Sequence, residues 1–249
     1  MQALAELGAI EPARSFDRAS ADYERARPGY PAALLEFLPL DREAEVLDLG
    51  AGTGKLTRVL AERYRRVVAV EPLDGMRGIL EQVVPAVESL AGEAEAIPLP
   101  DASVDGVFAA QAFHWFANDD AVAEIARVLR PGGVLALIWN EPVDPSPLPA
   151  PYSTYLEGLH APSLQAIQSG LSWSELIARG PFDELREGQV LHQQVLGRDD
   201  VLAFARSVSW IAHRPDDERG QIMGNLDALL TTGPFAFPMQ ANVNWAVRA

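Results

Sequence analysis

The sequence predicts a doubly wound α/β fold, in which helices cover both faces of a mostly parallel sheet. Short apolar runs alternate with segments of helical periodicity between residues 45 and 140. The runs are continuous rather than alternating with polar residues, which is typical of strands buried on both faces. The first run ends in a glycine-rich turn, GAGTG, that opens a helix. Together these three observations indicate successive strand–helix units.

Each element of this region has its own signal. The strands predicted from apolar runs are 45–49, 66–70, 87–91, 104–110 and 134–139. The helices predicted from apolar spacing are 55–63, 73–84 and 121–129. A further helix is expected at 32–38, because Pro31 suits a first helical position. Arg130-Pro131-Gly132-Gly133 is expected to end a helix and lead into the fifth strand.

The pattern changes after Trp139. Prolines at nearly every second position from Pro142 to Pro151 exclude a regular helix or a central strand, and they indicate a linker or the entrance to a lid. Beyond them we expect helices at 152–177, 199–210 and 215–230, and strands within 182–196 and at 235–247. The prediction is one domain over residues 1–249, with a seven-stranded sheet whose C-terminal edge strand is antiparallel. Its parts are an N-terminal cap (1–42), a ligand-binding core (43–140), a helical lid and substrate region (141–231) and the edge strand (232–249).

Composition narrows the function classes. The net charge of −15 repels polyanions, so nucleic acid and anionic membranes are not expected as partners. The chain has no cysteine and only four histidines, without an HxxxH pair, so neither thiolate catalysis nor a metal site is expected. No apolar stretch has the length of a membrane helix, and the first residues lack a leader pattern, so a cytoplasmic protein is expected. A monomer and a homodimer both remain open.

The glycine turn raises the question of what approaches its backbone. Gly50, Gly52 and Gly54 alternate directly after Asp48 in VLDLGAGTGKL. Backbone N–H groups at a helix start are unsatisfied and can receive ligand oxygens, and glycines lack the Cβ atoms that would hold a ligand away. The alternative is a tight strand-to-helix turn that needs glycine only for its φ angle, for which one glycine would suffice. We therefore expect a nucleotide-like cofactor against this loop.

Spacing restricts the kind of cofactor. A dinucleotide fingerprint needs glycine where the chain has Lys55 or Thr57, and a phosphate loop fails at Leu49 and Leu56. Glu71 ends the second predicted strand, where a carboxylate can accept hydrogen bonds from both hydroxyls of a ribose. The alternative for Glu71 is an exposed acid at a strand end. The expected ligand therefore carries a ribose and lacks a recognisable polyphosphate site.

Four segments in order resemble the class I S-adenosylmethionine-dependent methyltransferases, specifically the type 11 branch of small-molecule enzymes. They are VLDLGAGTGKLT (46–57), VVAVEPLDGM (67–76), GEAEAIPLPDASVDGVFAAQAFHWF (92–116) and RVLRPGGVLALIWN (127–140). The resemblance covers residues 15–140 well and the remainder loosely. YERARPGYP (23–31) is similar to a segment that closes over the cofactor in the trans-aconitate methyltransferase subgroup. The resemblance implies a Rossmann-like sheet, S-adenosyl-L-methionine as cofactor and S-adenosyl-L-homocysteine as product.

The resemblance also implies roles for individual residues. Those expected around the methionine part of the cofactor are Asp48, Gly50, Ala51, Gly52, Thr53, Gly54 and Gln111. Those expected around its nucleoside are Glu71 at the ribose and Pro72, Met76, Glu93 and Ala94 at the adenine, where the family more often has aspartate at position 93. Tyr23 would cover the sulfonium and Arg27 would pair with the cofactor carboxylate. Apolar packing is the alternative for Pro72 and Met76, and a routine surface loop is the alternative for Tyr23 and Arg27.

Methyl transfer asks the protein mainly for alignment and for exclusion of water. A base is needed where the acceptor loses a proton, as a hydroxyl does, and a carboxylate needs none. His114, just past the fourth strand, is the best-placed general base, and ordering of its loop is the alternative. The acceptor-side candidates are Trp115, Tyr152, Arg206 and Trp210, with core or surface roles as alternatives. Arg206, Trp210, His213 and Arg214 share a helical face if the helix continues that far, which would suit an anionic acceptor.

The function expected from the sequence is methyl transfer from S-adenosylmethionine to a small organic molecule, at a carboxylate or hydroxyl oxygen. A nucleotide-dependent oxidoreductase is an alternative that the glycine spacing disfavours. A non-catalytic or regulatory protein that binds the same cofactor is another. Methylation of nucleic acid is disfavoured by the charge and by the absence of an Asn/Asp-Pro-Pro-Tyr/Phe tetrad.

Overall fold

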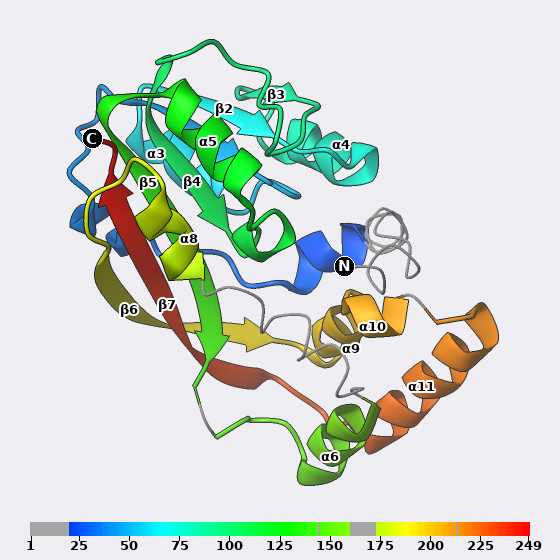
Figure 1. The fold of residues 1–249 in the computed structure, drawn as a ribbon. Coiled ribbons are helices and arrows are strands. Elements are labelled where there is room, and N and C mark those ends of the chain that lie inside the picture. The colour runs from blue at the N-terminus through cyan, green and yellow to red at the C-terminus, as the bar shows by residue number, and fades with distance from the viewer. Residues whose placement is uncertain (1–19, 144, 160–172, 213) are drawn as a thin grey trace.

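The sheet is the organising element of the fold. The computed structural model describes residues 20–143, 145–159, 173–212 and 214–249. Its strands are β1 (Glu45–Leu49), β2 (Arg66–Val70), β3 (Glu88–Leu90), β4 (Val104–Ala110), β5 (Leu129–Pro142), β6 (Arg186–Leu196) and β7 (Phe235–Val247). They form one seven-stranded sheet in the order β3-β2-β1-β4-β5-β7-β6 (Figure 1). Strand order reverses between β1 and β4, which both run parallel to their neighbours, so the switch point expected to bind a ligand lies there.

The predicted fold class is confirmed, with one change at the sheet margin. β7 is antiparallel to β5, as expected for the C-terminal strand, but β6 pairs with its other side. The edge strand is therefore β6 rather than β7. Burial gives the reason, because Ala241 and Val243 of β7 are fully buried, whereas Leu191 of β6 is 71% exposed.

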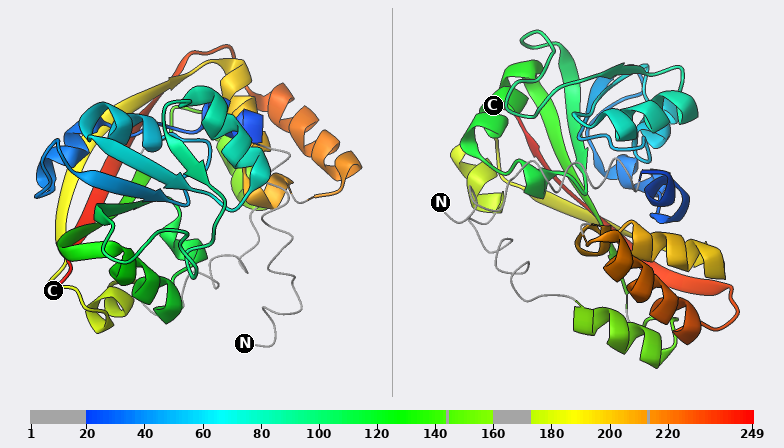
Figure 2. Two further views of the ribbon diagram at one scale, coloured as in Figure 1. Left: turned by 90° about the horizontal axis from the view of Figure 1, so that it is seen from above. Right: turned by 90° about the vertical axis from the view of Figure 1, so that its right-hand side faces the viewer.

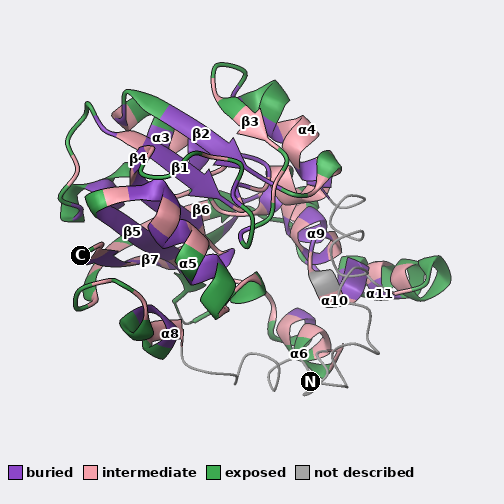
Figure 3. Cartoon of the chain, turned by 45° about the horizontal axis from the view of Figure 1, so that its top comes forward, coloured by how far each residue is buried: buried purple, intermediate pink, exposed green. Residues whose placement is uncertain are grey.

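Helices cover both faces of the parallel part. They are η1 (Ala32–Phe37), α3 (Thr57–Arg63), α4 (Asp74–Val83), η2 (Phe113–Trp115), α5 (Asp119–Val128) and α8 (Trp173–Arg179). One face packs against α5 and α8 through Ile125 and Ile177. The other packs against η1 and α3 through Leu34 and Leu60. Figure 3 shows the resulting pattern of buried strands under helices whose outer faces are exposed.

Four further helices form a group at one end of the sheet, which we call the lid. They are α6 (Ala150–Leu159), α9 (Arg198–Arg206), α10 (Ser209–Ala212) and α11 (Asp216–Leu229). These helices share an apolar cluster of their own, which includes Leu202, Leu226 and Phe235. Figures 1 and 2 show them gathered beyond the ends of β5 and β7.

Several predicted boundaries differ from the structure. The helix expected at 32–38 is the 3₁₀ helix η1, and the helix expected at 199–210 is divided into α9 and α10. The helix expected at 152–177 corresponds to α6 and α8 at its two ends, and residues 160–172 lie outside the described residues. The Arg130–Gly133 turn is continuous with β5. Residues 1–19 of the expected cap and His213 also lie outside the described residues.

Candidate functional site

The glycine turn lies at the switch point, directly after β1. Gly50, Gly52 and Gly54 have φ angles of +69°, +57° and +85°. A side chain makes this left-handed region unfavourable. The turn geometry therefore favours glycine at all three positions, whereas one was expected from the sequence.

Two of these glycines are also required by packing within the protein. A Cβ on Gly50 would lie 2.8 Å from the Cβ of Ala112, and one on Gly54 would lie 3.1 Å from the Cγ of Leu80. Gly52 differs, because a Cβ there would meet no atom within 4 Å. Of the three glycines, Gly52 is thus the one that borders open space, and a ligand has room to approach its backbone.

Asp48 is a buried acid with half of its carboxylate unused. Its exposed fraction is 1%, and its Oδ2 accepts a hydrogen bond of 2.6 Å from the Thr57 hydroxyl. Its Oδ1 has no hydrogen-bond partner among the described residues. The pKa of Asp48 is raised to about 7, mainly by burial; the hydrogen bonds with Thr57 lower it and the charge of Glu71 raises it. A buried acceptor of this kind is suited to a ligand that brings a donor or a positive charge.

Glu71 is also buried, and it touches the glycine turn. Its Oε2 accepts from the backbone N–H of Gly52 at 2.8 Å, and its Oε1 accepts from Leu73 at 3.0 Å. A carboxylate oxygen has room for a second hydrogen bond. The structure thus brings together Gly52, expected at the methionine part of the cofactor, and Glu71, expected at its ribose.

A short helix at residues 20–26 contacts the glycine turn through Glu24; we call it, with residues 27–29, the strap. Tyr23 and Tyr30 project from it and from the chain that follows. Burial raises the pKa of both phenols, and nearby carboxylates raise it further, Glu71 acting on Tyr23 and Asp48 on Tyr30. The guanidinium of Arg27 lies 4.5 Å from the ring centroid of Phe204 and 5.3 Å from that of Tyr23. The strap therefore places aromatic rings and one cation beside the two acids.

The β4 side of the site is formed by the turn after that strand. Gln111 has a φ of +51°, and its side chain donates to the backbone oxygen of Asn140 at 2.7 Å. His114 is exposed, and its ring lies 5.1 Å from that of Trp115. Desolvation lowers its pKa, which favours the neutral imidazole at pH 7. Among the described residues, His114 makes no hydrogen bond through its ring.

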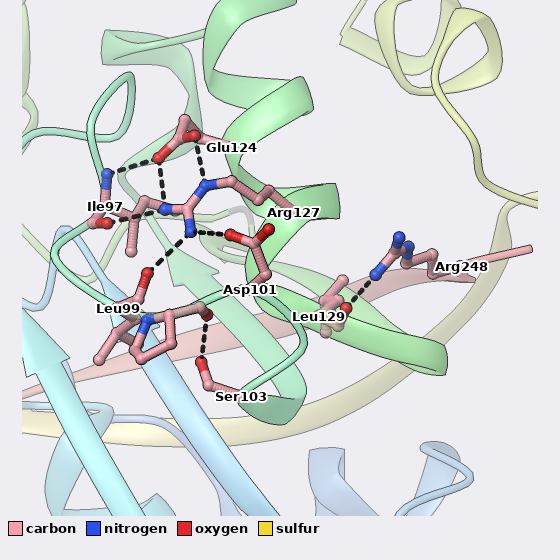
Figure 4. Close-up of polar contacts among 9 residues, drawn as sticks. Ile97, Leu99, Asp101, Ser103, Glu124, Arg127, Leu129 and Arg248 are labelled. Atoms are coloured by element: carbon pink, nitrogen blue, oxygen red, sulfur yellow. Dashed lines mark hydrogen bonds and ion pairs between the residues drawn. The ribbon is translucent and has the colours of Figure 1, made fainter.

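The residues expected around the adenine follow β2 and β3. Met76 and Ala94 are buried, whereas Pro72 and Glu93 are exposed. The loop that carries Glu93 and Ala94 continues to Ile97 and Leu99, which are hydrogen-bonded to Arg127 of α5 (Figure 4). There the Arg127 guanidinium donates to the backbone oxygens of Ile97 and Leu99. This loop is therefore fixed in place without any contribution from a ligand.

The acceptor-side candidates separate in the structure. Trp115, in the short helix η2 that follows β4, is 57% exposed. Tyr152 is 1% exposed inside the lid cluster, and burial raises its pKa to about 12. Tyr152 therefore packs in this apolar cluster, and its place in a pocket wall stays a prediction. Trp210 packs against the same cluster. Arg206 donates two hydrogen bonds to Asp22 at 2.8 and 3.0 Å. An ion pair of this kind was the alternative to a role at the acceptor.

Sequence reasoning missed several residues that complete the site. They are Glu24, Tyr30, Asn140, His192, Gln194 and Ser207, all in contact with the strap or its neighbours. Asn140 carried a usable signal, because it is the polar residue that ends the apolar run VLALIW. His192 and Gln194 carried none, because alternating residues of an edge strand are ordinarily polar.

Comparisons with known proteins agree with this arrangement. A family model described as a methyltransferase domain matches residues 47–137. A methyltransferase-like protein of Schizosaccharomyces pombe is 36% identical over 228 residues, which cover 89% of this chain and 88% of that protein. The chain belongs to the methyltransferase family. Fold and family together make it a class I S-adenosylmethionine-dependent methyltransferase.

Two further matches place this methyltransferase among its relatives. A solved type II methyltransferase from Anaeromyxobacter dehalogenans has a TM-score of 0.63 and 29% identity, covering 89% of this chain and 97% of its own. A malonyl-[acyl-carrier protein] O-methyltransferase of Serratia marcescens is 35% identical over 127 residues, covering 49% of this chain and 50% of that protein. The second match is therefore confined to about half of each chain.

Proposed function

We propose that this methyltransferase binds S-adenosylmethionine at the glycine turn and transfers its methyl group to an oxygen of a small organic acceptor. The observation that carries the proposal is the unsatisfied Oδ1 of buried Asp48, close in the chain to the open space beside Gly52. A cationic ligand with hydrogen-bond donors fits such a place, because an acid with a pKa of about 7 becomes a better acceptor as it ionises.

Each residue at the site then has a role toward the cofactor. Asp48 would accept from its ammonium group, and Glu71 from its ribose hydroxyls. Ala94 and Met76 would border the adenine, and Tyr23 and Arg27 would cover the methionine end. When bound, the cofactor supplies a methyl group already activated on a sulfonium. The protein adds alignment and exclusion of water, to which the strap contributes by lying over the turn.

An oxygen acceptor is supported by two observations. The relative from Serratia marcescens is named as an O-methyltransferase. His114, whose pKa is lowered by desolvation, lies just past β4 and would take a proton if the acceptor is a hydroxyl. The trans-aconitate methyltransferase subgroup, whose name describes a carboxylic acid, remains part of this proposal through the YERARPGYP segment.

Replacing His114 by alanine distinguishes the two acceptor oxygens. For a hydroxyl acceptor we expect turnover to fall about 100-fold, because a general base contributes on that order. For a carboxylate acceptor we expect turnover within about threefold of the unmodified protein, because no proton is lost. The measurement is the steady-state rate with each acceptor class. Asn118→Ala would be a poor control, because the Asn118 side chain caps α5. Asp120→Ala, an exposed position on α5, is the better one.

The test of the function itself uses labelled cofactor. The protein is incubated with a metabolite extract and S-adenosylmethionine bearing a trideuterated methyl group, and products are examined by mass spectrometry. We expect a small molecule that carries the added label, together with S-adenosylhomocysteine. Tight binding of S-adenosylhomocysteine by calorimetry without any labelled product from a broad extract would favour the non-catalytic alternative. Absence of both would refute the proposal.

A further inference from the structure

The strap is held on two sides by different parts of the molecule. On the cofactor side, the Glu24 carboxylate accepts from the Thr53 hydroxyl at 2.6 Å and from the Arg58 guanidinium at 2.6 Å. The Lys55 ammonium donates to the backbone oxygen of Glu24 at 2.7 Å. Thr53 belongs to the glycine turn and is 1% exposed. One acid of the strap thus joins the turn and the helix α3 that follows it.

On the lid side, three residues of the strap contact α9 and the residue after it. Asp22 receives the two hydrogen bonds from Arg206. Arg25 donates to Asp200 at 2.6 Å, and Arg27 donates to both the hydroxyl and the backbone oxygen of Ser207. Figures 1 and 2 show the strap helix beside α9.

The sheet supplies a third attachment beneath the strap. Gln194 of β6 donates to the backbone oxygen of Ala26, and Asn140 of β5 donates to that of Gly29, both at 2.8 Å. These bonds fix the C-terminal end of the strap. The N-terminal end of the strap is held by the side-chain ion pairs of Asp22 and Glu24. The side chains of Glu24, Asp22 and Arg206 are 20%, 30% and 37% exposed.

We propose that the strap links the glycine turn to the lid. Cofactor exchange then requires release of the Asp22–Arg206 ion pair as well as of the Glu24 contacts. Glu24 and Arg206 are positioning residues in this scheme, since both act through the strap. Arg206, a lid residue whose hydrogen bonds go to the strap, would then control how long the cofactor stays bound. The inference rests on the proposed binding of S-adenosylmethionine beneath the strap.

The decisive variant is Arg206→Gln, because it removes a charge from the lid alone. We expect S-adenosylhomocysteine to dissociate about fivefold faster, the change that a partly exposed ion pair of about 1 kcal/mol provides. Asp22→Asn breaks the same pair from the strap and is expected to give the same rate, and the double variant should be no faster than either one. Glu24→Gln is expected to accelerate dissociation about tenfold, because hydrogen bonds to charged groups are the stronger ones.

Two matched controls separate the strap from general loosening. Arg198→Gln removes an arginine from the same helix α9, where it pairs with Asp227 of the lid instead of the strap. Glu62→Gln removes an exposed acid from α3 that has no hydrogen bond or ion pair with the described residues of the strap. Both are expected to leave the dissociation rate unchanged. Thermal melting of every variant shows which of them are folded.

Surface plasmon resonance with the full chain and S-adenosylhomocysteine gives these rates. No binding by the unmodified protein would overturn the proposed function and the strap with it. Binding with an unchanged rate in both Arg206→Gln and Asp22→Asn would overturn the strap alone. Equal acceleration by Arg198→Gln would also overturn it, because the effect would then come from the lid as a whole.

Discussion

At the scale of a single residue, Asp48 makes the stability of the fold depend on pH. An acid whose pKa is about 7 in the folded protein, against an ordinary value of 3.8, keeps its proton in the native state while the unfolded chain has released it. The native state therefore binds more protons between these two pH values. Its stability falls as pH rises through this window, and the loss remains above pH 7.

We therefore expect Asp48→Asn to stabilise the fold in a pH-dependent way. Relative to the unmodified protein, its gain in unfolding free energy should be about 2 to 4 kcal/mol larger at pH 8 than at pH 4, because each unit of pKa shift corresponds to about 1.4 kcal/mol. Denaturant melts at the two pH values measure the difference. Asp120→Asn, an exposed acid on α5, is the control. A gain for Asp48→Asn that is equal at both pH values would show that Asp48 is ionised in the native state throughout.

Glu71→Ala tests the ribose assignment. We expect the variant to bind S-adenosylhomocysteine about 1 to 3 kcal/mol more weakly, which is the range for a buried hydrogen-bond partner left unmet. Isothermal titration calorimetry measures this, with Glu88→Ala, a half-exposed acid on β3, as the control. Because Glu71 also holds the N–H of Gly52, thermal melting of the apoprotein separates damage to the turn from loss of a ligand contact. Unchanged affinity would refute the assignment.

At the scale of elements, the glycines in the turn between β1 and α3 differ in their surroundings, because Gly50 is packed against Ala112 and Gly52 borders open space. We expect Gly52→Ala to cost about 1 kcal/mol of stability, from φ strain alone. Gly50→Ala should cost more, because its Cβ would also clash with Ala112. For affinity toward S-adenosylhomocysteine the order should reverse among folded variants, since only the Gly52 methyl projects into open space. Thermal melts and calorimetry give both orders, and an unaltered affinity in Gly52→Ala would place the cofactor elsewhere.

The elements also show why some boundaries were predictable. β7 was expected at 235–247 and occupies those residues, because apolar and polar residues alternate along it between two neighbouring strands. Its place within the sheet was not predictable, because alternation reports which face is buried and says nothing about which strand lies alongside. The division between α9 and α10 was missed for a similar reason, since helical spacing continues from Arg206 to Trp210 although the helix ends between them.

At the scale of the whole molecule, the site divides into a predictable half and an unpredictable one. Asp48 lies in β1 and the glycines follow it, and Glu71 follows the adjacent parallel strand β2, so their meeting is a consequence of topology. The strap meets α9 through residues separated by about 180 positions, as Arg27 and Ser207 are. Such contacts leave no local pattern, because each partner alone resembles an ordinary charged or polar surface residue. Arg206 illustrates this, since its pairing with Asp22 became visible only in three dimensions.

The lid has its own apolar cluster, yet β5 and β7 run from the sheet core toward it and the strap contacts both parts. We therefore expect the molecule to unfold in a single cooperative transition. S-adenosylhomocysteine at about 100 times its dissociation constant should add about 2.7 kcal/mol, which raises the midpoint of a chain of this size by about 5 to 10 °C. Differential scanning calorimetry with and without the ligand measures this. Two transitions, of which only one moves with the ligand, would show that the lid melts independently and that its contacts with the strap do not join it to the cofactor-binding core.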